Sequence, residues 1–290
     1  MQYFTDPDFP PDTEPWKRPR EIVGNPQFIV DGASRHDIDQ GALGNCWFLA
    51  SAAALAAHHP EAFHRVVPTG QSFNFNDGYI GRFVFNFYPN GVQQTVYVDD
   101  RLPTSQGQLV YCSNKATPNE FWPCLLEKAY AKFKGGYANL NGGHIKQALQ
   151  DLTGRPVNVR DIRADKFGSA AIFHFLQEGG DNGALIVAGI YLDGPGDGQL
   201  PNGLVKGHAY SVTKLHQLTT PAGVVNLIRL RNPWGCGEWN GAWSDSSREM
   251  ASLSRRQQEE LKFHTQDDGE FWMEFKDFVR NFHEINICYV

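Results

Sequence analysis

The residues best suited to chemistry surround Cys46, in the stretch QGALGNCWFLASAAAL from Gln40 to Leu55. Two glycines precede the cysteine and an alanine-rich apolar run follows it, which predicts a tight turn leading into the first turn of a buried helix. At a helix N-terminus the unpaired backbone N–H groups favour the thiolate, the form of cysteine that attacks carbon. The Cys46 N–H and the Gln40 amide can there hold the oxyanion of an attacked carbonyl. The stretch therefore predicts a cysteine nucleophile.

A nucleophilic thiol needs a base and a group that orients the base, and the second half of the sequence offers both. His208, in GLVKGHAYSV, begins a predicted strand, and Asn232, in LIRLRNPWG, ends the next one, where Pro233 turns the chain. We therefore expect both side chains at neighbouring strand ends, where the asparagine oxygen can accept the imidazole N–H. Trp234 lies two residues further on, and its ring can shield the pair from water.

Each of these residues also has an ordinary structural explanation. A cysteine in an Ala/Leu-rich helix is most often a buried thiol, a histidine is usually only hydrogen-bonded, and an asparagine before proline usually belongs to a turn. The combination of thiol, imidazole and amide in this order, with a glutamine spaced to complete an oxyanion hole, favours catalysis over coincidence.

Composition narrows the class of protein. Charged residues make up 20% of the 290 and the net charge is −6, with no Lys/Arg-rich run, so nucleic-acid binding has no support. The N-terminus lacks the features of a signal peptide, and no apolar run approaches the roughly 20 residues of a membrane span. A cytoplasmic protein without membrane insertion is expected. The five cysteines lack metal-type pairing, which indicates reduced thiols and no zinc site.

Hydrophobic patterning predicts an α+β protein of two lobes. Residues 1–30 are rich in proline and aspartate, which favours an extended N-terminal strap lying on a surface. Residues 31–156 form a mainly helical lobe, with a hairpin at 79–98 and helices after Cys46, at 120–134 and at 147–153. Residues 157–290 form a lobe rich in β-sheet. Its predicted strands are 184–192, 208–215, 224–231, 270–275 and 285–290, with helices at 170–177 and 254–263.

These stretches resemble the protease core of the calpains, the calcium-dependent intracellular cysteine proteases. QGALGNCWFLAS, GLVKGHAYSVT, LRNPWGCGEWNGAWSD and DDGEFWMEF occur in the family's order, and the likeness covers nearly the whole chain. The resemblance implies a papain-like two-lobed fold with a cleft between the lobes. It implies Cys46 as nucleophile, His208 as general base and then acid, and Asn232 as the residue that orients the ring. Gln40 is implied in the oxyanion hole and Trp234 beside the triad. The implied reaction is limited proteolysis of cytosolic proteins through a thioester.

The resemblance also implies two calcium sites, one in each lobe, made of the oxygen ligands that Ca²⁺ prefers. In the first lobe the implied ligands are the carbonyls of Val30 and Gly32 and the carboxylates of Asp37 and Glu120. In the second lobe they are the Gln266 carbonyl and the carboxylates of Glu238, Asp245, Asp268 and Glu270. By composition alone, the run QDDGE would be taken for a solvated acidic turn.

Departures from the family pattern are local. Residues 155–205 match poorly, Asn45 replaces a common aspartate, and Cys236 stands where many relatives carry an acidic residue. No EF-hand loop pattern occurs, so a core without regulatory tail domains is expected, and the family's small subunit is not expected as a partner. Protein or peptide substrates and a calpastatin-like inhibitor are the expected partners, and a monomer is the default.

Two other functions stay open. A calcium-dependent transglutaminase also passes through a cysteine thioester, but a resemblance to that family would call for an aspartate in place of Asn232. A non-catalytic, calcium-responsive binding module is the second alternative, which the intact Cys46 and His208 disfavour.

Overall fold

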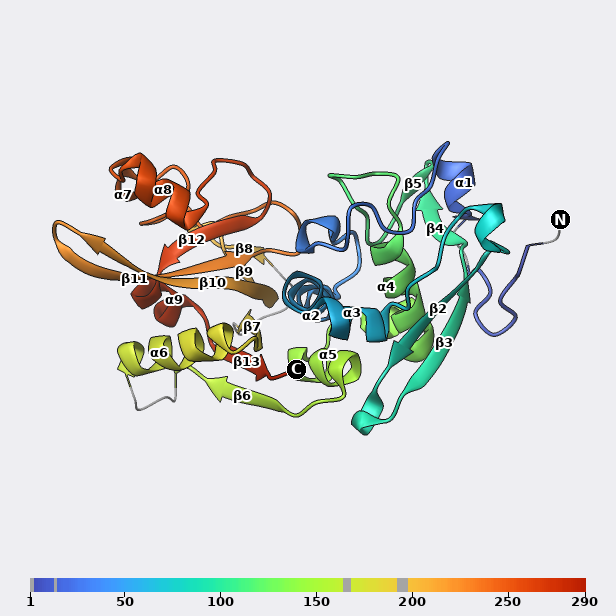
Figure 1. Cartoon of the computed structure of the whole chain (residues 1–290), viewed down its shortest axis with the longest axis horizontal. Coiled ribbons are helices and arrows are strands. Elements are labelled where there is room, and N and C mark those ends of the chain that lie inside the picture. The colour runs from blue at the N-terminus through green and yellow to red at the C-terminus, as the bar shows by residue number, and fades with distance from the viewer. Residues whose placement is uncertain (1–2, 13–14, 164–167, 192–197) are drawn as a thin grey trace. The chain divides into compact units, whose positions relative to one another are not determined.

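The computed structural model describes residues 3–12, 15–163, 168–191 and 198–290 (Figure 1). By its internal contacts the chain divides into two compact units, residues 1–155 and 156–290. The predicted lobe boundary, between residues 156 and 157, lies next to this division. Helices and strands occur in both units, which confirms the predicted α+β class. Among the described residues, none of the helices is long and apolar enough to cross a membrane.

Unit 1, residues 1–155, is built on three helices and a hairpin. The helices are α2 (Cys46–His58), α4 (Trp122–Phe133) and α5 (Ile145–Thr153), and the hairpin pairs β2 (Arg82–Phe87) with β3 (Gln94–Asp99). Shorter elements are β1 (Trp16–Lys17), α1 (Pro19–Ile22), α3 (Pro60–Val66), β4 (Leu102–Ser105) and β5 (Gln108–Leu109). Single 3₁₀ turns lie at η1 (Arg35–Asp37), η2 (Phe75–Asp77), η3 (Pro89–Gly91) and η4 (Tyr137–Leu140).

Helix α2 is the centre of unit 1, because every residue from 46 to 56 is buried. A helix that is apolar on all sides can only lie in a core, and its alanines let neighbouring elements approach closely. The Phe48 ring stacks on Tyr130 of α4, with ring centroids 3.9 Å apart. In the view of Figure 1, α4 lies between α2 and the β2–β3 hairpin. The hairpin turns Phe83, Phe85 and Phe87 inward, as its alternating sequence predicts.

The N-terminal segment is packed more firmly than the predicted surface strap. Strand β1 pairs with β4, and α1 begins at Pro19, whose fixed φ suits the first turn of a helix. The Asp6 carboxylate is 1% exposed and forms an ion pair with Lys132 of α4 at 2.7 Å. Composition predicts an extended backbone here, but it carries no information about this buried partner.

Unit 2, residues 156–290, is built on a six-stranded antiparallel sheet in the order β12-β11-β10-β7-β13-β6. The strands are β6 (Val157–Asp161), β7 (Leu185–Ile190), β10 (His208–Thr220), β11 (Gly223–Arg231), β12 (Glu270–Glu274) and β13 (Glu284–Cys288). Helices are α6 (Gly168–Asp181), α7 (Arg248–Ala251), α8 (Arg255–Leu261) and α9 (Phe275–Asn281), and β8 (Gly198–Gln199) pairs with β9 (Val205–Lys206). Sequence patterning misses β6, an edge strand with the exposed residues Asn158 and Val159.

Two apolar clusters hold unit 2 together. Phe173 of α6 and Phe275 of α9 pack with Tyr210 of β10 in the larger cluster. The smaller cluster joins the outer part of the sheet to α7 and α8 through Met250, Leu261 and Trp272. The sheet is therefore supported along the strands β10 and β11, whose ends carry His208 and Asn232.

Candidate active site

The loop that precedes Cys46 is fixed by close backbone contacts that only glycine allows. A Cβ atom on Gly41 would lie 2.2 Å from the Tyr111 carbonyl oxygen, and one on Gly44 would lie 2.5 Å from the Asn141 Oδ1. The Gly44 N–H donates a hydrogen bond to that same Oδ1 at 3.1 Å. The two glycines of the motif thus let the loop dock on its neighbours, and the docked loop leads directly into α2.

Cys46 is the first residue of α2 and is 8% exposed. Its position at the N-terminus of a 13-residue helix favours a negative charge on the sulfur. The buried Gln40 amide lies on the same loop and donates a hydrogen bond from Nε2 to the Leu43 carbonyl at 2.7 Å. A side-chain amide has two N–H hydrogens, so a second remains for another oxygen. Gln40 and Cys46 are thus suited to the predicted oxyanion hole.

A buried carboxylate lies directly behind this turn, and sequence reasoning missed it. The Asn45 Nδ2 donates to Glu127 Oε1 at 2.7 Å, and the Cys112 N–H donates to Glu127 Oε2 at 2.9 Å. Burial raises the pKa of Glu127 to about 7, against which the two hydrogen bonds act. The Asn45 side chain makes no capping hydrogen bond to α2, and its Nδ2 points to the glutamate. The sequence signal that could have indicated this contact is Asn45, which replaces a common aspartate.

Glu127 predicts a pH dependence of stability. Its pKa is about 7 in the folded state and 4.5 in the reference state, so between these values only the folded protein keeps the proton. The free energy of unfolding therefore falls as pH rises through this window, by about 3 kcal/mol. Glu127→Gln should remove most of this fall, because glutamine can accept from the Cys112 N–H and donate to Asn45 Oδ1, which has no hydrogen-bond partner. Urea unfolding at about pH 5 and about pH 8 measures the difference.

The control for this comparison is Glu61→Gln on the exposed surface of α3, which should keep the wild-type pH dependence. An equal fall for Glu127→Gln and wild type would show that Glu127 does not carry the effect.

In unit 2, His208 and Asn232 lie within hydrogen-bond distance. His208 begins β10, opposite Ile190 of β7, after Gly207 turns the chain with a φ of 64°. Asn232 follows the last residue of β11, and its N–H donates to the Gly269 carbonyl at 2.7 Å. Because β10 and β11 pair antiparallel, the start of one lies beside the end of the other. His208 Nε2 and Asn232 Oδ1 are 2.7 Å apart.

The hydrogen bonds around Asn232 fix the tautomer of the histidine. The Trp234 N–H donates to Asn232 Oδ1 at 3.0 Å, and the Asn232 Nδ2 donates to the Gly237 carbonyl at 3.0 Å. The amide oxygen therefore faces the ring, so His208 Nε2 must carry a hydrogen to bond it. In the neutral ring the basic lone pair is then on Nδ1. This is the nitrogen that can take a proton from a thiol.

Aromatic rings keep this pair away from water. The Trp234 ring packs against the imidazole at a tilt of 54°, with centroids 4.8 Å apart, and the Tyr210 ring meets it edge-on at 5.1 Å. His208 is 2% exposed and Asn232 is fully buried. A hydrogen bond in such a dry environment is stronger than one in water, so the ring is held in one orientation.

Two of the four predicted calcium ligands of unit 1 are joined through one hydrogen bond. The Val30 N–H donates to Glu120 Oε1 at 2.7 Å, and burial, with the negative charge of Asp37, raises the Glu120 pKa to about 7. The Asp37 carboxylate accepts from the Ser34 N–H and the Trp122 indole. Gly32 lies in a left-handed turn, with a φ of 90°. Buried carboxylates thus gather beside this turn.

The predicted ligands of unit 2 gather around the turn before β12. Glu238 Oε1 accepts from the Gly269 N–H at 3.0 Å, and Asp268 Oδ1 accepts from the Glu270 N–H at 2.9 Å. The Gln266 carbonyl accepts from the Asp268 N–H at 2.9 Å. Burial and neighbouring carboxylates raise the pKa of Glu238 to about 8 and of Asp245 to about 6, although His264 lowers the latter. Across the described ranges, no group of three or more His, Cys, Asp or Glu side chains has the arrangement of a metal site.

Comparison with known proteins identifies the family. The family model described as "Calpain family cysteine protease" matches residues 4–289. The chain belongs to the calpain family. The predicted family is thereby confirmed, and the mixed α+β structure is consistent with a calpain protease core fold.

Individual calpains are similar over almost the whole chain. Calpain clp-4 of Caenorhabditis elegans is 45% identical over 299 residues, which cover 98% of this chain and 41% of the relative. The calpain-1 catalytic subunit of Mus musculus is 46% identical, over 94% of this chain and 37% of its own length. Human calpain-9 is 45% identical, and the match covers 94% of this chain and 39% of calpain-9. The chain thus spans about two fifths of the length of these calpains.

Proposed function

We propose that this calpain-family chain is a calcium-dependent cysteine endopeptidase with Cys46, His208 and Asn232 as its triad. The observation that carries the proposal is the 2.7 Å hydrogen bond between His208 and Asn232. The Trp234 N–H bonds the Asn232 oxygen and so fixes the tautomer of His208. A histidine held in this way has one ring nitrogen committed to orientation and the other available for proton transfer. Family membership and the position of Cys46 at a helix N-terminus support the same assignment.

The proposed reaction has two steps, acylation and deacylation. The Cys46 sulfur attacks the carbonyl carbon of the scissile peptide bond, and His208 Nδ1 takes the thiol proton. The Cys46 N–H and the Gln40 amide hold the oxyanion. His208 then gives its proton to the leaving amine, and a thioester remains. A water deprotonated by His208 hydrolyses the thioester and restores the thiol.

We propose that the acidic residues of unit 2 hold a calcium ion. The Asp245 Oδ2 is buried and has no hydrogen-bond partner, and the nearby Glu238 is held by one backbone N–H. Partial burial and the charges of neighbouring carboxylates raise the pKa values of Glu238 and Asp245, and a bound dication would favour their ionised forms. The proposed ligands are the Gln266 carbonyl with Glu238, Asp245, Asp268 and Glu270. Bound calcium would supply positive charge to this turn, which adjoins Asn232 through the Gly269 carbonyl.

We propose that residues of unit 1 hold a second ion. Glu120 and Asp37 raise each other's energy when both are ionised, and the Val30 and Gly32 carbonyls supply neutral oxygen ligands. We propose that calcium, when bound at both sites, would restrict the loops that hold the proposed ligands and so make catalysis depend on calcium. The thiol and the imidazole must come within about 3 to 4 Å of each other for proton transfer, so small changes in these loops control activity.

Replacing one proposed ligand should raise the calcium requirement. We expect Asp245→Ala to increase the calcium concentration for half-maximal peptide cleavage by about tenfold or more, because one lost carboxylate–calcium contact easily exceeds 1.4 kcal/mol. The calcium-induced rise in melting temperature, measured without substrate, should shrink in parallel. The control is Asp181→Ala at the exposed end of α6, which is not among the proposed ligands. Equal calcium curves for Asp245→Ala and wild type would remove Asp245 from the site.

Labelling with a peptide epoxide tests the function itself. We expect calcium to accelerate covalent modification of Cys46, measured by mass spectrometry of the labelled peptide. Labelling that never exceeds that of an ordinary thiol would favour a non-catalytic, calcium-responsive binding module. Labelling combined with amine incorporation, but without peptide hydrolysis, would favour a transglutaminase-type reaction.

The physiological setting follows from the family. We propose that the substrates are cytosolic proteins cut at a few extended segments, since an accessible strand must enter the catalytic site. We further propose a cytoplasmic location, a monomer, and a calpastatin-like protein as inhibitor.

A further inference from the structure

The outer edge of β3 in unit 1 is open over part of its length. β3 pairs with β2 on its other edge, with Thr95 opposite Asn86 and Tyr97 opposite Val84. The Tyr97 carbonyl accepts from the Lys132 Nζ at 2.9 Å, so it faces away from β2. Thr95, two residues earlier, turns its N–H and carbonyl to the same outer edge. No hydrogen bond to these two groups occurs in the described ranges, and residues 92–95 are exposed.

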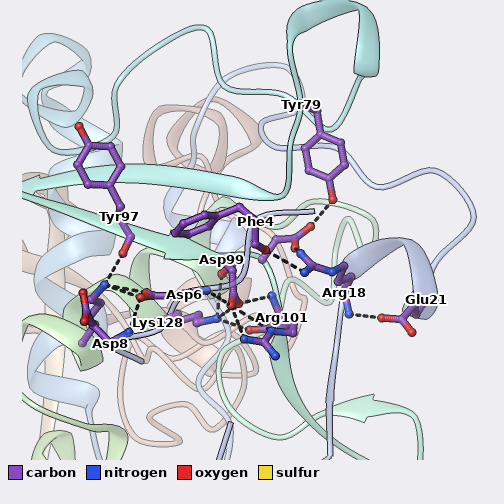
Figure 2. Close-up of polar contacts among 12 residues, drawn as sticks. Phe4, Asp6, Asp8, Arg18, Glu21, Tyr79, Tyr97, Asp99, Arg101 and Lys128 are labelled. Carbon is purple, nitrogen blue, oxygen red and sulfur yellow. Dashed lines mark hydrogen bonds and ion pairs between the residues drawn. The ribbon is translucent and has the colours of Figure 1, made fainter. Parts of the chain in front are cut away.

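The other end of the same edge is covered. The Asp6 N–H donates to Asp99 Oδ2 at 2.8 Å, and the Lys128 Nζ donates to the Asp99 carbonyl at 2.8 Å (Figure 2). Lys132 also holds both oxygens of the Asp6 carboxylate, at 2.9 and 2.7 Å. The N-terminal segment therefore closes the edge at Asp99 and leaves it open near Thr95.

A cavity of about 540 Å³ lies beside the open part of the edge. Its walls include the rings of Phe4, Tyr97 and Phe133 and the charged side chains of Arg82 and Asp8. The volume is within the range of about 300 to 1,000 Å³ that is common for ligand pockets. A strand laid along β3 would place every second side chain toward this cavity.

Arg82 places a positive charge beside the cavity. Its guanidinium lies 5.1 Å from the Tyr97 ring centroid and 5.9 Å from that of Phe4. No carboxylate of the described residues pairs with it, whereas Lys132 is matched by Asp6. The flanking rings hold the guanidinium in place, so a carboxylate of a bound peptide would meet a preorganised partner. Asp8 offers a second, opposite charge at the rim.

We propose that the β3 edge and this cavity form an exosite for an extended, acidic segment of a protein substrate. The segment adds to β3 as a further strand, with main-chain hydrogen bonds to Thr95 and an acidic side chain on Arg82. This inference rests on the proposed protease activity. Binding outside the catalytic site raises the local concentration of the substrate chain, so it favours long, unfolded substrates over short peptides.

The test compares two substitutions of Thr95. Thr95→Pro removes the outward N–H, while Thr95→Val keeps it, and both lose the hydroxyl bond to Asn86. The substrates are β-casein, an acidic unfolded protein, and a short fluorogenic peptide. We expect the KM for β-casein to be about fivefold higher for Thr95→Pro than for Thr95→Val, with unchanged kinetics on the short peptide. Equal KM values for β-casein would overturn the exosite.

Arg82→Gln provides a second variant that leaves the backbone intact. We expect it to raise the KM for β-casein about threefold at low salt and to have little effect at about 1 M salt, where exposed charges are screened. The control is Arg65→Gln, an exposed arginine that stacks on Tyr88 outside the cavity. If both variants raised the KM for β-casein by the same factor, the cause would be the change in net charge, and the proposed contact between Arg82 and an acidic side chain would be overturned.

A binding measurement separates this inference from the proposed function. Fluorescein-labelled β-casein is titrated with the Cys46→Ala protein by fluorescence anisotropy. About fivefold tighter binding of the Thr95→Val form than of the Thr95→Pro form would support the exosite even if the wild type cleaved neither substrate. Equal binding by both forms, together with normal cleavage of the short peptide, would reject the exosite and leave the protease intact.

Discussion

Cys46→Ala is expected to lower the rate of peptide cleavage by at least about 10⁴-fold, because no other group in the proposed site can form the thioester. The fold should persist, since the change removes one sulfur atom from a side chain that is 8% exposed. Cleavage of a fluorogenic peptide with saturating calcium measures the first expectation, and thermal unfolding measures the second.

Cys46→Ser is the conservative companion of this variant. A serine hydroxyl at the helix N-terminus stays protonated. Cys46→Ser should therefore lose nearly as much activity as Cys46→Ala. Cleavage within tenfold of the wild-type rate in Cys46→Ala would exclude the thioester mechanism. Loss of activity together with a lowered melting temperature would leave the mechanism without support, and the epoxide labelling of the wild type would then decide it.

Local pattern was sufficient to find the elements that carry the proposed triad. The alanine-rich run predicted a buried helix after Gly44, and α2 begins at Cys46. Alternation and turn residues placed His208 at a strand start and Asn232 at a strand end, and the hairpin of β10 and β11 brings them together. These features depend on residues that are close in sequence, which is why a single sequence contains them.

Contacts between distant segments were not accessible in the same way. Glu127 reaches Asn45 across 82 positions of the chain, and Asp6 reaches Lys132 across 126. Nothing in the helical spacing of α4 indicates that Glu127 is buried or that Lys132 holds the N-terminal segment. The extended strap was predicted from composition, and its packing depended on a partner that composition cannot specify.

The calcium ligands illustrate a further limit. Val30, Gly32 and Gln266 are proposed to bind through carbonyl oxygens, which every residue has, so residue type gives no signal for them. Their assignment came from the family resemblance. The structure contributes the buried carboxylates beside them, above all the Asp245 oxygen without a hydrogen-bond partner. The Asp245→Ala measurement is therefore the direct test of the proposed site in unit 2.

Asn232→Ala is expected to lower kcat by about 10²- to 10⁴-fold with little change in KM, because the imidazole loses the acceptor that fixes its tautomer and orientation. The substitution also removes the acceptor of the Trp234 N–H, so the indole that covers the ring should become less ordered. The rate at which a peptide epoxide modifies Cys46 should fall in parallel, since the same histidine assists both reactions.

The matched control for Asn232→Ala is Asn226→Ala on the same strand β11, where the amide bonds Gln217 far along the hairpin from His208. That variant should keep wild-type kcat. Melting temperatures of both variants separate a local effect on the ring from a general loss of stability. Wild-type kcat in Asn232→Ala would mean that Trp234 and Tyr210 hold the imidazole by packing alone, and the hydrogen bond would then have no orienting role.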